Sequence, residues 1–318
     1  MYYTVSHTTR FRYSLPVTES VMEVRMQPRT EGAQRCLHFE LETQPAATVL
    51  QYTDYRGNIV HHFDILPAHR RLEIVARAVV EIGTEANVAL PEALEAEAWR
   101  ALDVQRRSGD AWDYLHESHF VRFTPRLQAF AQQVVAQRQA DPLTQLLALN
   151  QAIYTGFDYM PATTTVDSQI DELLAEGRGV CQDFTHLMVA VCRWWGIPAR
   201  YVSGYLHHRN DDHDRSAADA THAWMEAWLP GLEWVGFDPT NALPAGERHI
   251  RGAIGRDYAD VSPARGVFKG EAASELAVAV AVSAGTALPA SAPPVTTSEW
   301  AARANADAAA QMQQMQQQ

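Results

Sequence analysis

The chain has 318 residues and a formal net charge of −12 from 26 basic and 38 acidic residues, a length that suggests two domains. No basic cluster is interleaved with aromatic residues, which argues against a nucleic-acid partner. No apolar run approaches the ~20 residues that cross a bilayer, the start lacks an apolar leader and three cysteines cannot all pair, so we expect a cytoplasmic protein without a membrane partner.

The first 85 residues predict a β domain. Residues 4–14, 38–65 and 72–82 are rich in Val, Thr, Tyr and Phe and alternate in part, as strands do. Several short strands in this space predict a small antiparallel β-sandwich over residues 1–85. Residues 86–110 are rich in Ala, Glu and Arg and predict a linker with a short helix.

Helical patterns follow the linker. Residues 124–139 and 141–157 each begin with a capping residue and a proline, which is typical of helix starts. Residues 167–177 predict a third helix, capped by Asp167 or Ser168 and closed by Gly177. A fourth helix is predicted from Cys181, because apolar residues recur there at helical spacing.

The last part of the chain predicts mainly strands. Residues 199–206 form one strand, and residues 221–229 and 233–240 form two more around a Pro-Gly turn. We expect residues 111–283 to form the core, including a C-terminal strand near residues 274–282, and residues 284–318 to form a disordered tail. The predicted class is α+β.

Cys181 is a candidate nucleophile. A thiol attacks as the thiolate, and the start of a helix favours negative charge. The alternative is a small buried apolar residue, which is our interpretation of Cys192 on the apolar face of the same helix. Cys181 by itself leaves the two interpretations equally open.

The hairpin adds two partners for this thiol. His222 and Asp238 are almost equally far from the Pro-Gly turn, so antiparallel pairing brings them close, although the sequence does not fix the register. A carboxylate beside an imidazole fixes its tautomer and stabilises its charged form. Each residue alone has an ordinary structural explanation, but together they match the nucleophile, base and orienting acid of thiol catalysis. Trp224, on the His222 face, is our candidate for a cleft wall.

Four motifs stand in order in this region: Gly-Val-Cys at 179–181, Gly-Ile-Pro-Ala-Arg at 196–200, Thr-His-Ala-Trp at 221–224, and Trp234 followed by Asp238-Pro239. With them, residues 110–265 resemble the bacterial transglutaminase-like superfamily, whose core is papain-like. The β-rich start and the later GRDYADVSPARGVFKG resemble its two-domain subgroup, which has an N-terminal β-sandwich. The resemblance implies that Cys181 is the nucleophile, His222 the general base and Asp238 the orienting acid.

One segment departs from the pattern, because Leu232-Glu233 stand where the superfamily often has a glycine.

We expect an enzyme that cleaves amide bonds of a peptide or protein through a thioester, without cofactor or metal. The alternatives are transfer of the acyl group to an amine, and a non-catalytic protein-binding module. The Cys181 N–H is a natural oxyanion donor; Tyr159 is a candidate second donor, although a packing role is the interpretation that we favour for it.

A metal site is the weakest alternative. Residues 207–214 are dense in possible ligands, but such runs are usually solvated loops, and no second ligand pair has zinc spacing. The possible ligands are His207, His208, Asp211, Asp212, His213 and Asp214.

Overall fold

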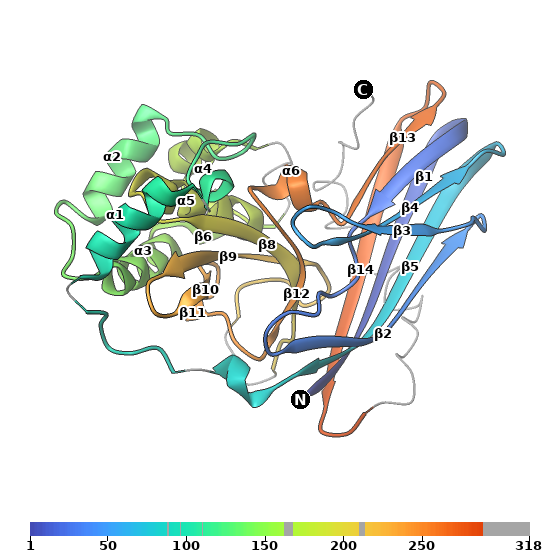
Figure 1. Ribbon diagram of the computed structural model, residues 1–318. Coiled ribbons are helices and arrows are strands. Elements are labelled where there is room, and N and C mark those ends of the chain that lie inside the picture. The colour runs from blue at the N-terminus through green and yellow to red at the C-terminus, as the bar shows by residue number, and fades with distance from the viewer. Residues whose placement is uncertain (88, 96, 110, 162–167, 210–213, 289–318) are drawn as a thin grey trace.

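The structure is a computed structural model that describes residues 1–318 except 88, 96, 110, 162–167, 210–213 and 289–318. A curled antiparallel sheet lies beside a unit in which helices cover a second sheet (Figure 1). The predicted α+β class is therefore confirmed. No helix in the described part of the chain is long and apolar enough to cross a membrane.

The N-terminal strands follow the predicted β segments closely. The long strand β1 joins two parts of the sheet, because its first half pairs with β5 and its second half with β4. Buried Phe11, Phe63 and Ile74 belong to the apolar core of this sheet. The strands are β1 (Tyr2–Val24), β2 (Gln34–Gln44), β3 (Leu50–Thr53), β4 (Ile59–Ile65) and β5 (His69–Ile82), in the order β2-β5-β1-β4-β3.

Two C-terminal strands complete this sheet. Both β13 (Ala264–Lys269) and β14 (Ser274–Gly285) pair with β1, the latter from Tyr2 opposite Gly285 to Tyr13 opposite Ser274. The strand expected near residues 274–282 therefore forms, but it pairs with β1 rather than with the core to which we assigned it, and it extends past residue 284. Because all seven strands are connected through β1, the sheet is one curled layer, and a sandwich of two separate sheets is not confirmed.

Most of the predicted helices begin at the capping residues identified in the sequence. The Thr124 hydroxyl accepts the Leu127 N–H at 3.1 Å, and Asp141 accepts the N–H groups of Leu143 and Thr144. The third predicted helix starts later, because Gln169 is its N-cap; Asp167 lies outside the described residues. The helical elements are η1 (Thr84–Asn87), α1 (Ala98–Ser108), η2 (Trp112–Tyr114), α2 (Pro125–Val134), α3 (Pro142–Gly156), α4 (Ile170–Glu176), α5 (Cys181–Trp194) and α6 (Tyr258–Val261).

The second sheet has the order β11-β10-β9-β8-β12. One face of the predicted hairpin, with Met225, Ala227 and Phe237, shares an apolar core with Phe184 and Leu187 of α5. This packing sets the start of α5 beside the start of β9. The strands are β8 (Ala199–Leu206), β9 (His222–Leu229), β10 (Glu233–Asp238), β11 (Leu243–Pro244) and β12 (His249–Gly255), and the short β6 (Asp158–Tyr159) and β7 (Arg178–Gly179) form a separate parallel pair.

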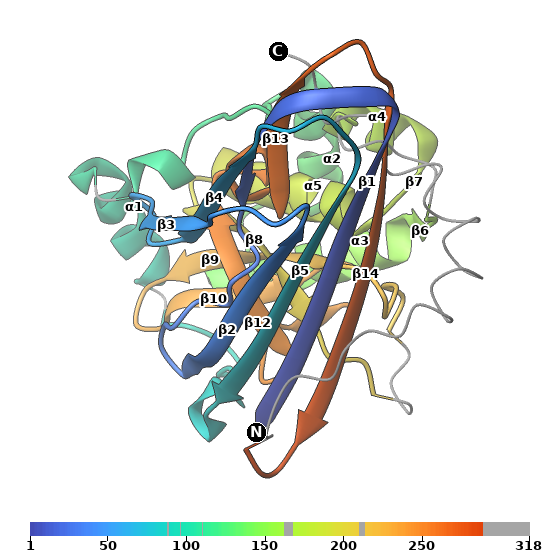
Figure 2. The ribbon, with the colours of Figure 1, turned by 90° about the vertical axis from the view of Figure 1, so that its right-hand side faces the viewer.

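The two sheets are in contact through buried groups. Figure 2 shows β1, β5 and β14 crossing in front of the helical unit. Tyr3 and Val5 pack with Tyr205 and Ile250, and the Asn58 side chain bonds the backbone N–H and carbonyl of Ile254, both at 2.8 Å. The N-terminal sheet therefore braces β8 and β12.

Candidate active site

The start of α5 positions Cys181. Cys181 is the first residue of the helix, and Asp183 accepts the Val180 N–H at 2.9 Å. A side chain at Gly179 would place its Cβ 2.9 Å from Oδ2 of Asp183, so glycine is needed for this cap to approach. Cys181 is half-buried at the helix end, whereas Cys192 is fully buried as expected.

Tyr159 reaches the same place from β6. Its partner in the parallel pair is Gly179, two residues before Cys181, and the Met160 N–H donates to the Gly179 carbonyl at 2.9 Å. Burial raises the pKa of Tyr159, and the neighbouring Cys181 raises it further. The phenol therefore stays protonated. The nearby backbone of Ala217 opposes part of this rise in pKa. A protonated hydroxyl has a hydrogen to donate.

The hairpin brings His222 and Asp238 together diagonally. The β9–β10 pairing runs from Leu229 opposite Glu233 to Met225 opposite Phe237, so His222 and Asp238 are not directly opposite each other. Nε2 of His222 nevertheless lies 2.8 Å from Oδ2 of Asp238, and both side chains are buried. The predicted neighbourhood is confirmed, and the register that the sequence left open is now defined.

The other ring nitrogen of His222 is the one available to the thiol. Nδ1 makes no hydrogen bond of normal geometry among the described residues, and Cys181 is close enough to interact with the ring. Burial lowers the pKa of His222, but the Asp238 carboxylate and Cys181 outweigh burial and raise that pKa to about 10. The site thus favours a charged imidazole between a carboxylate and a thiol.

Asp238 is held as a carboxylate by a full set of donors. Oδ1 accepts the N–H groups of Thr240 at 3.0 Å and Asn241 at 3.3 Å, and Oδ2 accepts the Asn241 side-chain amide at 2.8 Å. Burial alone would raise the pKa of Asp238, but the two histidines bonded to Oδ2 hold it well below its usual range. Asp238 can therefore orient His222 without taking its proton.

His249 is the residue that sequence reasoning missed. Its Nε2 lies 3.2 Å from Oδ2 of Asp238, and its Nδ1 accepts the Gly246 N–H at 3.2 Å. An accepting Nδ1 leaves the proton of a neutral imidazole on Nε2, so His249 donates to Asp238. Burial lowers the pKa of His249, which favours this neutral form. No motif around residue 249 signals this role; only the fold of β12 beside β8 brings the residue in.

These groups also include the donor types of a metal site. Ligand atoms of His222, Asp238 and His249 lie within 4.8 Å of one another. Both Nε2 atoms, however, lie at hydrogen-bond distance from one carboxylate oxygen, and the Nε2 atom of His249 carries its proton. The geometry is that of a hydrogen-bond network, because a metal ligand needs a free lone pair.

Two further expectations concern Trp224 and the loop at residues 207–214. Trp224 is fully buried, stacks on the His222 ring at 6.0 Å and meets the His249 ring edge-on at 5.1 Å, so its expected role as a cleft wall is wrong. In the loop, Asp211, Asp212 and His213 lie outside the described residues. Asp214 is bonded by Arg248 at 2.7 and 3.2 Å.

Comparison with known proteins is consistent with this fold. Residues 128–239 match the Transglutaminase-like superfamily, and residues 3–81 match the Bacterial transglutaminase-like N-terminal region. An uncharacterized protein of Mycobacterium leprae is 34% identical over 280 residues, which span 88% of this chain and 97% of the relative. An uncharacterized protein of Mycobacterium tuberculosis strain H37Rv is 34% identical over 275 residues, spanning 84% of this chain and 87% of the relative.

A solved structure gives the same picture at lower identity. A candidate cysteine protease from Cytophaga hutchinsonii superposes with a TM-score of 0.70 and 22% identity, covering 91% of this chain and 93% of its own. At this identity the similarity shows the fold alone. The sequence relatives and the two matched regions carry the assignment further: the chain belongs to the transglutaminase-like superfamily and carries the N-terminal region of its bacterial members.

Proposed function

We propose that this protein is a thiol-dependent hydrolase that cleaves amide bonds of a peptide or protein through Cys181, His222 and Asp238. The observation that carries the proposal is the position of the His222 ring, with Nε2 bonded to Asp238 at 2.8 Å and Cys181 interacting from the other side. This order of groups is the one that nucleophilic thiol catalysis requires.

The reaction begins with attack of the Cys181 sulfur on an amide carbonyl. The carbonyl oxygen becomes an oxyanion, for which the Cys181 N–H and the Tyr159 hydroxyl are the proposed donors. The charged His222 then gives its Nδ1 proton to the departing amine, which leaves a thioester on Cys181. Water attacks the thioester, His222 takes the proton from that water, and the carboxylic acid leaves as the thiolate re-forms.

The sharpest test is to trap the acyl-enzyme. Wild type, Cys181→Ala and Cys36→Ala proteins are each incubated with a peptide library and quenched in acid. Mass spectrometry then locates any acylated cysteine. We expect acylation of Cys181 in wild type and in Cys36→Ala, and none in Cys181→Ala. Cys36 is the matched control because it is a second half-buried thiol, far from His222 in the chain. An unlabelled Cys181 with every peptide would sink the proposal.

Transfer of the acyl group to an amine is the alternative outcome of the same thioester. A glutamine-containing peptide, supplied with and without a primary amine, separates the two. We expect ammonia release to exceed amine incorporation, and the reverse result would make the protein a transamidase. The chain contains a single lysine, Lys269, so it offers few amines of its own for self-modification.

If the protein were a non-catalytic binding module, the reactivity of the Cys181 thiol would not depend on His222. In such a protein the reaction of Cys181 with a thiol reagent would not change when His222 is replaced. We propose instead that His222→Ala shifts the pH dependence of that reaction, because the imidazole and the sulfur interact.

The cytoplasmic location also stays a proposal, and fractionation of cells of the source organism tests it.

A further inference from the structure

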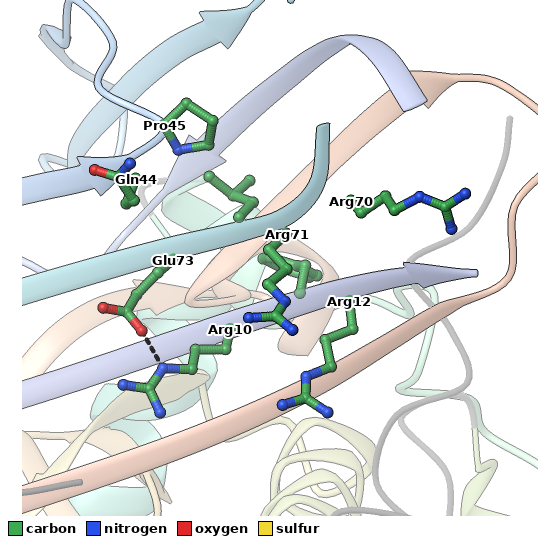
Figure 3. Close-up of a pocket in the computed structure, with 9 residues that line it drawn as sticks. Arg10, Arg12, Gln44, Pro45, Arg70, Arg71 and Glu73 are labelled. Carbon is green, nitrogen blue, oxygen red and sulfur yellow. Dashed lines mark hydrogen bonds and ion pairs between the residues drawn. The ribbon is translucent and has the colours of Figure 1, made fainter. Parts of the chain in front are cut away.

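A hollow of about 590 Å³ opens on the N-terminal sheet, away from the candidate active site. Figure 3 shows its side chains, which come from β1, β5 and the end of β2. Four arginines stand out against one carboxylate, while Phe11 and Leu72 have side chains that belong to the buried core of the sheet. Its lining residues are Arg10, Phe11, Arg12, Gln44, Pro45, Arg70, Arg71, Leu72 and Glu73.

The arginines differ in how they are neutralised. Arg10 lies directly opposite Glu73 across β1 and β5, and the two form an ion pair. Arg12 lies directly opposite Arg71, so two like charges face each other on the same side of the sheet. Arg70 extends away from this group in Figure 3 and donates to the Ser14 carbonyl at 2.8 Å.

The facing pair makes no ion pair within the described part of the chain. Neither Arg12 nor Arg71 forms a hydrogen bond or ion pair there, and Glu275, the partner of Arg12 on β14, forms no ion pair with it. Like charges directly opposite on a sheet are destabilising. The chain as a whole has a net charge of −12, so a positive hollow is a local departure from its general charge.

We propose that this hollow binds a small polyanion, with at least two carboxylate or phosphate groups, between Arg12 and Arg71. Arginine presents a planar fork of donors that matches both kinds of group bidentately. The volume of about 590 Å³ falls within the range of small-molecule sites. Glu73 neutralises Arg10 and closes one side of the site to anions, which directs the ligand to Arg12 and Arg71.

The test is titration calorimetry with two probes, sodium citrate for carboxylates and sodium pyrophosphate for phosphates. Wild type is compared with R12A/R71A and with R35A/R122A. The second variant is the matched control, because it also removes two exposed arginines, neither of which lines the hollow. We expect R12A/R71A to weaken binding of the preferred probe at least tenfold, and the control to change it less than twofold. The probe that binds tighter identifies the acidic group.

A second measurement guards against misfolding. Saturating probe should raise the melting temperature of wild type and of the control, but not that of R12A/R71A, whose own melting temperature without probe should be no lower. Three results would overturn the proposal: no binding of either probe to wild type at millimolar concentration, equal weakening in both double variants, or unchanged binding in R12A/R71A. The outcome does not depend on the proposed hydrolase activity.

Discussion

Nε2 of His249 lies 3.2 Å from Oδ2 of Asp238, the same carboxylate oxygen that bonds His222. The carboxylate therefore carries two imidazoles, one that interacts with the thiol and one that bonds to the Gly246 backbone. Because Nδ1 of His249 accepts the Gly246 N–H, the second imidazole acts on Asp238 as a neutral donor. His249 is thus placed to set how strongly Asp238 holds His222.

Replacement of His249 should change the pH profile of the reaction. His249→Ala removes a hydrogen bond to a buried charged group, which is worth about 1.5–3 kcal/mol. The Asp238 carboxylate should then attract the proton of His222 more strongly, so the alkaline limb of kcat/KM, along which the charged imidazole is lost, should move to higher pH. His249→Gln keeps an N–H donor and should restore much of the wild-type profile. Identical profiles for all three proteins would leave His249 with a packing role only.

Cys181→Ala should abolish amide cleavage, by about 10³-fold or more, because removal of the nucleophile leaves only binding and oxyanion stabilisation. The free energy of unfolding should change little, because Cys181 is half-buried and the substitution removes only its sulfur atom. Peptide cleavage and urea unfolding measure the two quantities. Cys36→Ala, the matched thiol variant, should retain full activity; equal losses in both variants would remove Cys181 from the mechanism.

The sequence predicted what local chemistry determines. Thr124 and Asp141 were identified as helix caps because capping depends on a few neighbouring residues. That His222 and Asp238 are neighbours follows from their almost equal distance from one turn. At that turn, Glu233 adopts a positive φ of 60°, a backbone conformation that favours glycine.

Contacts between distant segments were not predictable in the same way. The pairing of β14 with β1 joins the two ends of the described chain, and no periodicity encodes such a partner. His249 reaches Asp238 only because β12 pairs with β8, a partner that lies more than forty residues earlier in the chain at Leu206. The burial of Trp224 depends on Gly204 of β8, where a Cβ would lie 2.7 Å from the indole ring, and alternation along β9 gives no sign of this packing.

Tyr159→Phe tests the second oxyanion donor. The hydroxyl lies near Cys181 and has a hydrogen to donate, so its loss should lower kcat by about 10²–10³-fold while KM changes little. Steady-state kinetics on one peptide are sufficient. Tyr154→Phe removes the same atom from a tyrosine whose ring packs on Arg215. An unchanged kcat in Tyr159→Phe would return Tyr159 to the packing role that the sequence favoured.

Gly204→Ala should damage the support of the site. Gly204 lies opposite His222 in the β8–β9 pairing, and a Cβ there would collide with the Ile250 carbonyl and the Trp224 ring. Overpacking of this kind typically costs about 1–3 kcal/mol. Urea unfolding should show that loss, and cleavage should fall as Trp224 displaces the His222 ring. Gly156→Ala is the control, because its Cβ would meet nothing within 4 Å.

The raised pKa of His222 predicts a loss of stability at alkaline pH. A group whose pKa is higher in the folded than in the unfolded chain stabilises the fold fully below the unfolded value. For His222 that value is about 6.5, and the stabilisation disappears as pH rises through the folded pKa of about 10. Within this window the slope contributed by one group is at most about 1.4 kcal/mol per pH unit.

His222→Gln isolates this contribution, because the amide can still donate to Asp238 but does not titrate. Urea unfolding of both proteins between pH 6 and pH 10 gives the difference in unfolding free energy at each pH. We expect the advantage of wild type over His222→Gln to be largest at pH 6 and to shrink steadily towards pH 10. A difference that stays constant across this range would mean that His222 is neutral in the folded protein, and it would remove the charged imidazole on which protonation of the leaving amine depends.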